Sequence, residues 1–73
     1  MGRVILLSEI SGSIWKINCK VGDVIETGQD VIVIESMKME IPVSSPESGI
    51  ISELLVKQDE TVIEGNIVAR VEV

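Results

Sequence analysis

The chain has 73 residues and a formal net charge of −6, from 12 acidic and 6 basic residues. A domain of this size buries only about 60% of the surface that its unfolded chain exposes, which leaves little apolar material for an enclosed catalytic pocket. The acidic balance argues against nucleic acids and anionic membranes as partners, because both carry negative charge. Histidine, the commonest general base and metal ligand, is absent from the sequence. We therefore expect no autonomous catalytic activity.

Apolar runs and cysteine content indicate a cytoplasmic protein. The longest uninterrupted apolar run has four residues, as at Val4–Leu7, and is too short for a membrane span or a signal-peptide core. Cys19 is the only cysteine, so an internal disulfide is excluded. We expect Cys19 to be a small buried hydrophobic residue.

The apolar residues are almost all Val, Ile and Leu, with Trp15 as the one aromatic residue, and such β-branched richness favours strands over helices. Gly28 and Gly65 stand where tight turns need a positive φ. Pro42 cannot donate to a β-ladder, so we expect its strand at a sheet edge. Short apolar runs between turn residues predict strands at 3–7, 13–18, 24–25, 31–35, 39–44, 50–56, 61–63 and 67–73.

The chain is an internal repeat, because a shift of 37 positions aligns residues 12–35 with residues 49–72 without a gap. Glycines, apolar positions and charges recur together: Gly12, Ile14, Ile17, Lys20, Ile25, Gly28, Val31, Ile34 and Glu35 align with Gly49, Ile51, Leu54, Lys57, Val62, Gly65, Val68, Val71 and Glu72. Two repeats are too few for a solenoid. We therefore expect one domain over residues 1–73, an all-β flattened eight-strand barrel or sandwich. It would consist of two four-stranded antiparallel sheets with quasi-two-fold symmetry.

The centre of the repeat predicts a hairpin whose tip is residues 36–39, since an apolar run enters this segment and another leaves it. Lys38 would be exposed there. Met37 and Met39 flank it and can hardly both lie in the core, so we expect an exposed apolar collar suited to recognition by another protein. Exposed lysines are also ordinary, as we expect for Lys16, Lys20 and Lys57. From the residues alone, a special role for Lys38 and an ordinary surface role remain equal alternatives.

The hexapeptide Glu35-Ser36-Met37-Lys38-Met39-Glu40 resembles the attachment motif of biotin carboxyl carrier domains, in which the lysine between two methionines is biotinylated. The resemblance covers nearly the whole chain, including 20–29 and 46–51, and is closest to short bacterial biotin/lipoyl attachment proteins. It implies that Lys38 is the attachment site and that Met37 and Met39 are recognition flanks. Glu35, Ser36 and Glu40 are the remaining residues of the motif.

The sequence departs from the family pattern at three positions. Glu9 replaces a frequent proline, Ser36 replaces the more usual alanine, and Asp59 replaces a turn glycine. These departures concern local turns and leave the attachment motif intact. The two repeats are equal in length, so there is no room for the protruding thumb of some acetyl-CoA carboxylase carriers.

The resemblance implies that a biotin protein ligase joins biotin to Lys38 through an acyl-adenylate. A biotin carboxylase would then load a carboxyl group onto biotin, and a carboxyltransferase would discharge it. The protein itself would be a monomeric carrier without catalytic residues. One alternative is a lipoyl carrier of a 2-oxo acid dehydrogenase complex, a family that commonly has Asp-Lys-Ala where this chain has Met37-Lys38-Met39. Another is an unmodified barrel that acts as an adaptor.

Overall fold

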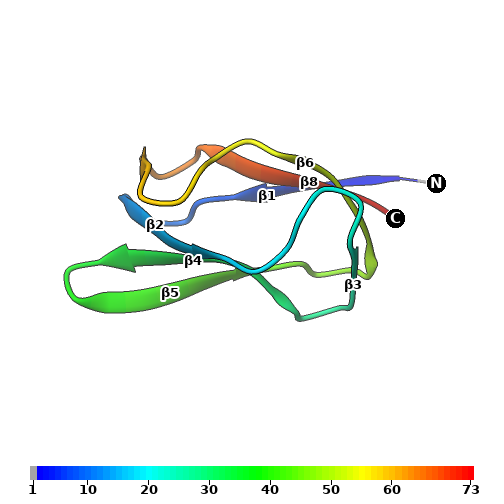
Figure 1. Cartoon of the computed structure of the whole chain (residues 1–73), viewed down its shortest axis with the longest axis horizontal. Coiled ribbons are helices and arrows are strands. Elements are labelled where there is room, and N and C mark those ends of the chain that lie inside the picture. Colours follow the sequence, from blue (N-terminus) through cyan, green and yellow to red (C-terminus); the bar gives the residue numbers. More distant parts are fainter. Residues whose placement is uncertain (1) are drawn as a thin grey trace.

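The computed structural model describes residues 2–73, and this part of the chain contains eight strands and no helix (Figure 1). One four-stranded sheet has the order β1-β8-β6-β3, the other has the order β5-β4-β2-β7, and all neighbours are antiparallel. The molecule is elongated, with extents of 36 × 17 × 17 Å. The strands are β1 (Arg3–Leu7), β2 (Gly12–Ile17), β3 (Val24–Ile25), β4 (Asp30–Ser36), β5 (Met39–Ser44), β6 (Gly49–Leu54), β7 (Thr61–Val62) and β8 (Ile67–Glu72).

The predicted fold class is confirmed, and the strand boundaries agree closely. β1, β3 and β5 match the predicted ranges, and the other strands differ by one or two residues at their ends. The largest difference is in β6, which we predicted to reach Val56 and which ends at Leu54. A register shift between Ile51 and Glu53 disturbs the β6–β8 ladder, and Leu54↔Ala69 is its last pair. Apolar residues continue beyond this point, but regular pairing stops.

The two halves of the repeat interlock, since each sheet contains strands from both. A shift of 37 residues carries the order β5-β4-β2-β7 onto β1-β8-β6-β3. Backbone hydrogen bonds between the halves also occur in equivalent pairs. The Gly22 N–H donates to the Ile51 carbonyl at 2.8 Å, and the Asp59 N–H donates to the Ile14 carbonyl at 2.7 Å. The expected quasi-two-fold symmetry therefore extends to individual hydrogen bonds.

Left-handed turn residues occupy equivalent places in the two halves. Gly28 and Gly65 have φ values of 81° and 93°, which confirms the predicted turns. Asp59 has a φ of 71° where Gly22 has 95°, so the aspartate adopts the backbone conformation of the glycine that it replaces. Asp is among the few residues that tolerate this region. The departure at Asp59 therefore leaves the turn unchanged.

The core is aliphatic and lies between the two sheets. Trp15 is half exposed and takes no part in it. Cys19 is buried as predicted, and burial, aided by the negative charge of Asp23, raises the pKa of its thiol. No helix in residues 2–73 has the length and hydropathy needed to cross a membrane. The buried apolar residues are Leu6, Ile14, Cys19, Ile25, Val31, Ile32, Ile34, Val43, Ile51, Val56, Val62, Val68, Ala69 and Val71.

Two buried serines stabilise equivalent turns, a feature that we did not predict from the sequence. Ser8 and Ser45 lie 37 residues apart and are almost completely buried. The Ser8 Oγ donates to the Ile10 carbonyl, and the Ser45 Oγ donates to the Glu47 carbonyl. The two turns make the same bond although Glu9 follows the first serine and Pro46 the second.

Gly12 and Gly49 allow close approach between neighbouring strands. A Cβ atom at Gly12 would lie 2.4 Å from the Glu35 carbonyl oxygen, and one at Gly49 would lie 2.2 Å from that of Glu72. We predict that Gly12→Ala and Gly49→Ala each lower the free energy of unfolding by about 1–3 kcal/mol, as overpacking does. Denaturant melts measure this loss. Lys16→Ala, at an exposed position of β2, is the control, and unchanged midpoints for both glycine variants would contradict the prediction.

Candidate functional site

The β4–β5 hairpin closes through a two-residue loop, Met37-Lys38, between the paired residues Ser36 and Met39. Met37 has a φ of 52° and Lys38 a φ of 65°. Two successive positive φ values are the mark of a type I′ turn, which normally carries Asn-Gly. A non-glycine residue in this region costs roughly 1–2 kcal/mol. The loop is therefore strained at the proposed attachment residue and at its neighbour.

The ladder below the loop holds the strained turn in place. Pairing continues along the hairpin from Ser36↔Met39 to Asp30↔Ser44. Ile32, Ile34 and Val43 anchor it in the core. This extended pairing fixes the register, so the two tip residues must reverse the chain whatever their preference. Lys38 is thus presented on a defined backbone and not on a free loop.

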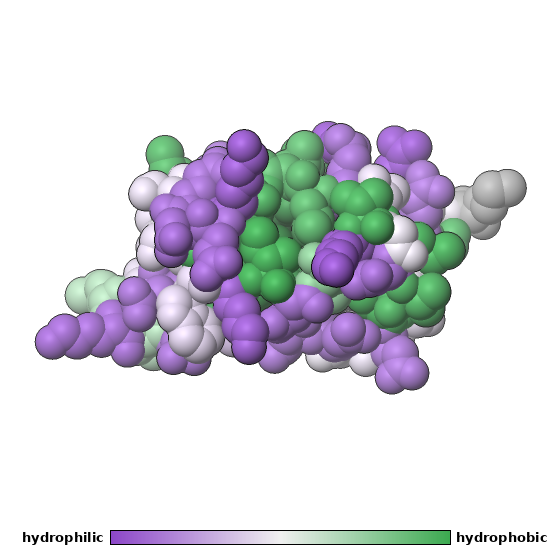
Figure 2. Space-filling view, in the orientation of Figure 1, coloured by the Kyte–Doolittle hydropathy of each residue, from purple (hydrophilic) through white to green (hydrophobic). Residues whose placement is uncertain are grey.

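The side chains of the tip project into solvent, as predicted. Met37 is 91% exposed and Met39 is 63% exposed, so neither belongs to the core. Lys38 is exposed too, but so are Lys16, Lys20 and Lys57. In the described part of the chain the ion pairs join Arg3 to Glu72 and Arg70 to Glu53, and neither involves Lys38. The space-filling view shows this end of the molecule projecting beyond the body (Figure 2).

The two acidic residues of the motif face each other across the hairpin. Glu35 and Glu40 are direct partners in the β4–β5 register and are both exposed. Like charges directly opposite each other are destabilising. Since side chains alternate between faces along a strand, this pair lies on one face of the hairpin while Ser36 and Met39 lie on the other.

All six predicted site residues therefore lie at one end of the hairpin. They occupy three different parts of it. Lys38 and Met37 form the apex, the two glutamates form an acidic face, and Met39 forms an apolar face beside half-buried Ser36. Sequence reasoning missed the backbone strain and the facing glutamates. The spacing of Glu35 and Glu40 around a two-residue loop was the available signal for the second feature.

Replacing Met37 with asparagine tests the turn strain directly. Asn accepts the left-handed region far better than Met, and Met37 makes little contact that could be lost. We predict that Met37→Asn raises the free energy of unfolding by about 1 kcal/mol. Met37→Leu keeps both the strain and an apolar side chain, so its midpoint should stay near that of the unchanged chain. Equal denaturation midpoints for the Asn and Leu variants would refute the strain.

Comparison with known proteins places this geometry in a family. The model of the biotin/lipoyl family, described as "Biotin-requiring enzyme", matches residues 6–71. The biotin/lipoyl attachment protein of Bacillus subtilis is 46% identical over 59 residues, which is 81% of each chain. Urea amidolyase of Saccharomyces cerevisiae is 45% identical over 71 residues, a match that spans 97% of this chain and 4% of that protein.

Solved structures agree with the sequence matches. The urea carboxylase of Kluyveromyces lactis superposes with a TM-score of 0.92 at 38% identity, over 99% of this chain and 6% of that one. In both large enzymes the similar segment is a small part of a much longer polypeptide. Because the family model covers most of its length, this chain belongs to the biotin/lipoyl family and is a biotin carboxyl carrier domain.

Proposed function

We propose that Lys38 is the residue to which a biotin protein ligase attaches biotin, and that the domain then moves a carboxyl group between a biotin carboxylase and a carboxyltransferase. The observation that carries this proposal is the position of Lys38. It is an exposed lysine at the apex of a two-residue turn, between two exposed methionines. Lys16, Lys20 and Lys57 are exposed without such a setting.

Attachment requires the Lys38 Nζ to act as a nucleophile. The ligase would present biotin as an acyl-adenylate, and the amine would attack its carbonyl carbon. An amide bond then forms, the bond from the acyl carbon to AMP breaks, and the amine releases its proton. The ligase must supply the base that accepts this proton. The carrier contributes an amine that no ion pair holds within residues 2–73, on a backbone whose position is fixed.

Attached biotin would supply a ureido nitrogen that accepts and releases the carboxyl group. The domain contributes a tether, and tethering raises the effective concentration of the bound group at both partner sites. In this proposal the domain is a substrate and a carrier, and the partner enzymes provide the catalytic groups. The net charge of −6 favours a monomer, because copies of the chain repel one another.

Mapping the modified residue tests the proposal. After incubation with a biotin protein ligase, ATP and biotin, we expect an intact mass increased by one biotinyl group, located on the peptide that contains Lys38. Lys38→Arg keeps the positive charge but lacks the amine nucleophile, so it should remain unmodified. Lys16→Arg is the matched control and should be modified like the unchanged chain. Biotin on the Lys38→Arg variant would disprove the assignment.

The lipoyl alternative makes a different prediction about the two flanking residues. Changing Met37 to Asp and Met39 to Ala gives the tip the Asp-Lys-Ala sequence common in lipoyl domains. In cells that contain both ligases and both cofactors, this variant should gain lipoylation relative to biotinylation, measured by intact mass. A double alanine variant of the same methionines separates loss of the collar from gain of the aspartate. An unchanged ratio would mean that the ligases read other features, such as the acidic face of Glu35 and Glu40.

A further inference from the structure

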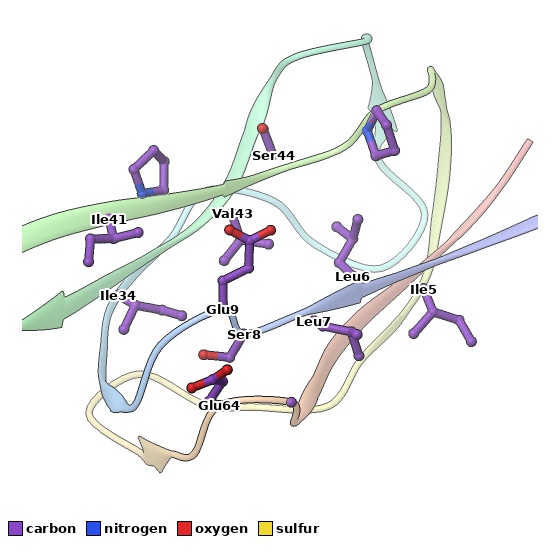
Figure 3. A pocket seen from close by; sticks show the side chains of 13 residues that line it. Ile5, Leu6, Leu7, Ser8, Glu9, Ile34, Ile41, Val43, Ser44 and Glu64 are labelled. Atoms are coloured by element: carbon purple, nitrogen blue, oxygen red, sulfur yellow. The ribbon is translucent and has the colours of Figure 1, made fainter.

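A groove of about 580 Å³ lies between β1 and β5, the strands at the open edges of the two sheets (Figure 3). Leu7 and Ile5, each nearly half exposed, line the β1 side. Ile41, Pro42 and Val43 line the β5 side. The groove is thus largely aliphatic at a place where the sandwich is not closed by strand pairing.

The two sides of the groove differ at equivalent positions of the repeat. Ile5 on the β1 side corresponds to Pro42, and Glu9 corresponds to Pro46. Two prolines therefore make the β5 side poor in hydrogen-bond donors. Figure 3 shows the Glu9 carboxylate standing among the aliphatic side chains of the groove. The lining consequently combines an apolar wall with an acidic acceptor on the opposite side.

The backbone of β1 adds further polar groups. Gly2 and Val73 exchange reciprocal hydrogen bonds of 3.1 Å. Along an antiparallel ladder, such hydrogen-bonded pairs alternate with pairs whose N–H and carbonyl groups point away from each other. The β1–β8 register then turns the N–H and carbonyl of Ile5 away from β8, over the open edge. At the equivalent place β5 has Pro42, which lacks an N–H. The groove therefore offers a backbone donor and a backbone acceptor at Ile5 and the carboxylates of Glu9 and Glu64.

An apolar track connects this groove to Lys38. Met39, Ile41 and Val43 share one face of β5, because side chains alternate along the strand. Exposure falls along this row, from 63% at Met39 to 8% at Val43. Ile41 is three residues from Lys38, about 10 Å at the rise of a strand. Lysine plus the five-carbon acyl chain of biotin reaches roughly 14 Å, counted as about 11 bonds of ordinary length.

We infer that the β1–β5 groove is a resting site for the biotinyl-lysine arm of Lys38. This inference rests on the proposed attachment of biotin. The acyl chain and the sulfur-containing ring match the aliphatic lining and the Met39 track. The ureido N–H groups match the Glu9 carboxylate. Because a short tether gives an effective concentration in the millimolar range, even weak intrinsic affinity populates the docked arm.

Amide NMR spectra of the unmodified and biotinylated chain test this site. Intact mass and peptide mapping first establish biotin on Lys38. Docking predicts shift changes at the hairpin tip and also at Leu7 and Glu9, which lie on β1 and in the loop that follows it. Biotin on Lys38 with changes confined to residues 35–40 would overturn the docking while the attachment stands. Absence of biotin from Lys38 would overturn both.

Three variants test the groove further. Each replaces a residue with the one found at the equivalent position in the other half of the repeat, where the same backbone conformation already accepts it. Leu7→Ser takes the residue at position 44, and Glu9→Pro takes the residue at position 46. Each should remove the distant shift changes on biotinylation while leaving those at the tip. Val24→Thr, which copies Thr61 at an exposed site outside the groove, should keep them. Groove shifts that vary with protein concentration before biotinylation would instead identify a contact between copies and overturn the inference.

Discussion

The fold depends on the exchange of strands between the two halves of the chain. Neither half contains a complete sheet, because β1 and β3 of the first half pair with β8 and β6 of the second. The bonds of Gly22 to Ile51 and of Asp59 to Ile14 add further ties in both directions. A small domain without a disulfide gains cooperativity from this arrangement, since loss of either half leaves unpaired strand edges in the other.

Strand exchange also explains where the candidate site lies. The chain must pass from one half to the other through the β4–β5 hairpin, so this connection lies at the centre of the repeat and projects from one end of the body. Its ladder is long enough to force Met37 and Lys38 into the left-handed region. Residues with little preference for positive φ can occupy this turn because the pairing of β4 with β5 offsets their conformational cost. Backbone strain at a functional residue commonly has this origin.

Much of this architecture could be predicted because it follows local rules. β-branched runs and turn glycines such as Gly28 located the strands, and the repeat indicated two matching sheets. The strain at Met37 and Lys38 could not be predicted, since neither residue favours positive φ and only the ladder imposes it. The close approach of β4 to Gly12 could not be predicted for a related reason. It depends on where β4 lies in space and not on the residues next to Gly12 in the sequence. The β1–β5 groove is likewise set by how the two sheets are offset in space.

The pairing of Gly2 with Val73 has a mechanical consequence. A shift of 37 residues relates the Gly2–Val73 pair to the Met39–Ser36 pair, so the two ends of the molecule are built alike. One end is closed by the hairpin turn. The other end holds both ends of the described chain (Figure 1). Polypeptide joined at Val73 would leave from the end farthest from Lys38. The domain would then act as a stiff lever about 36 Å long, pivoting at its rear. A small rotation at the pivot would sweep the lysine through a wide arc, and the joint would not obstruct the tip.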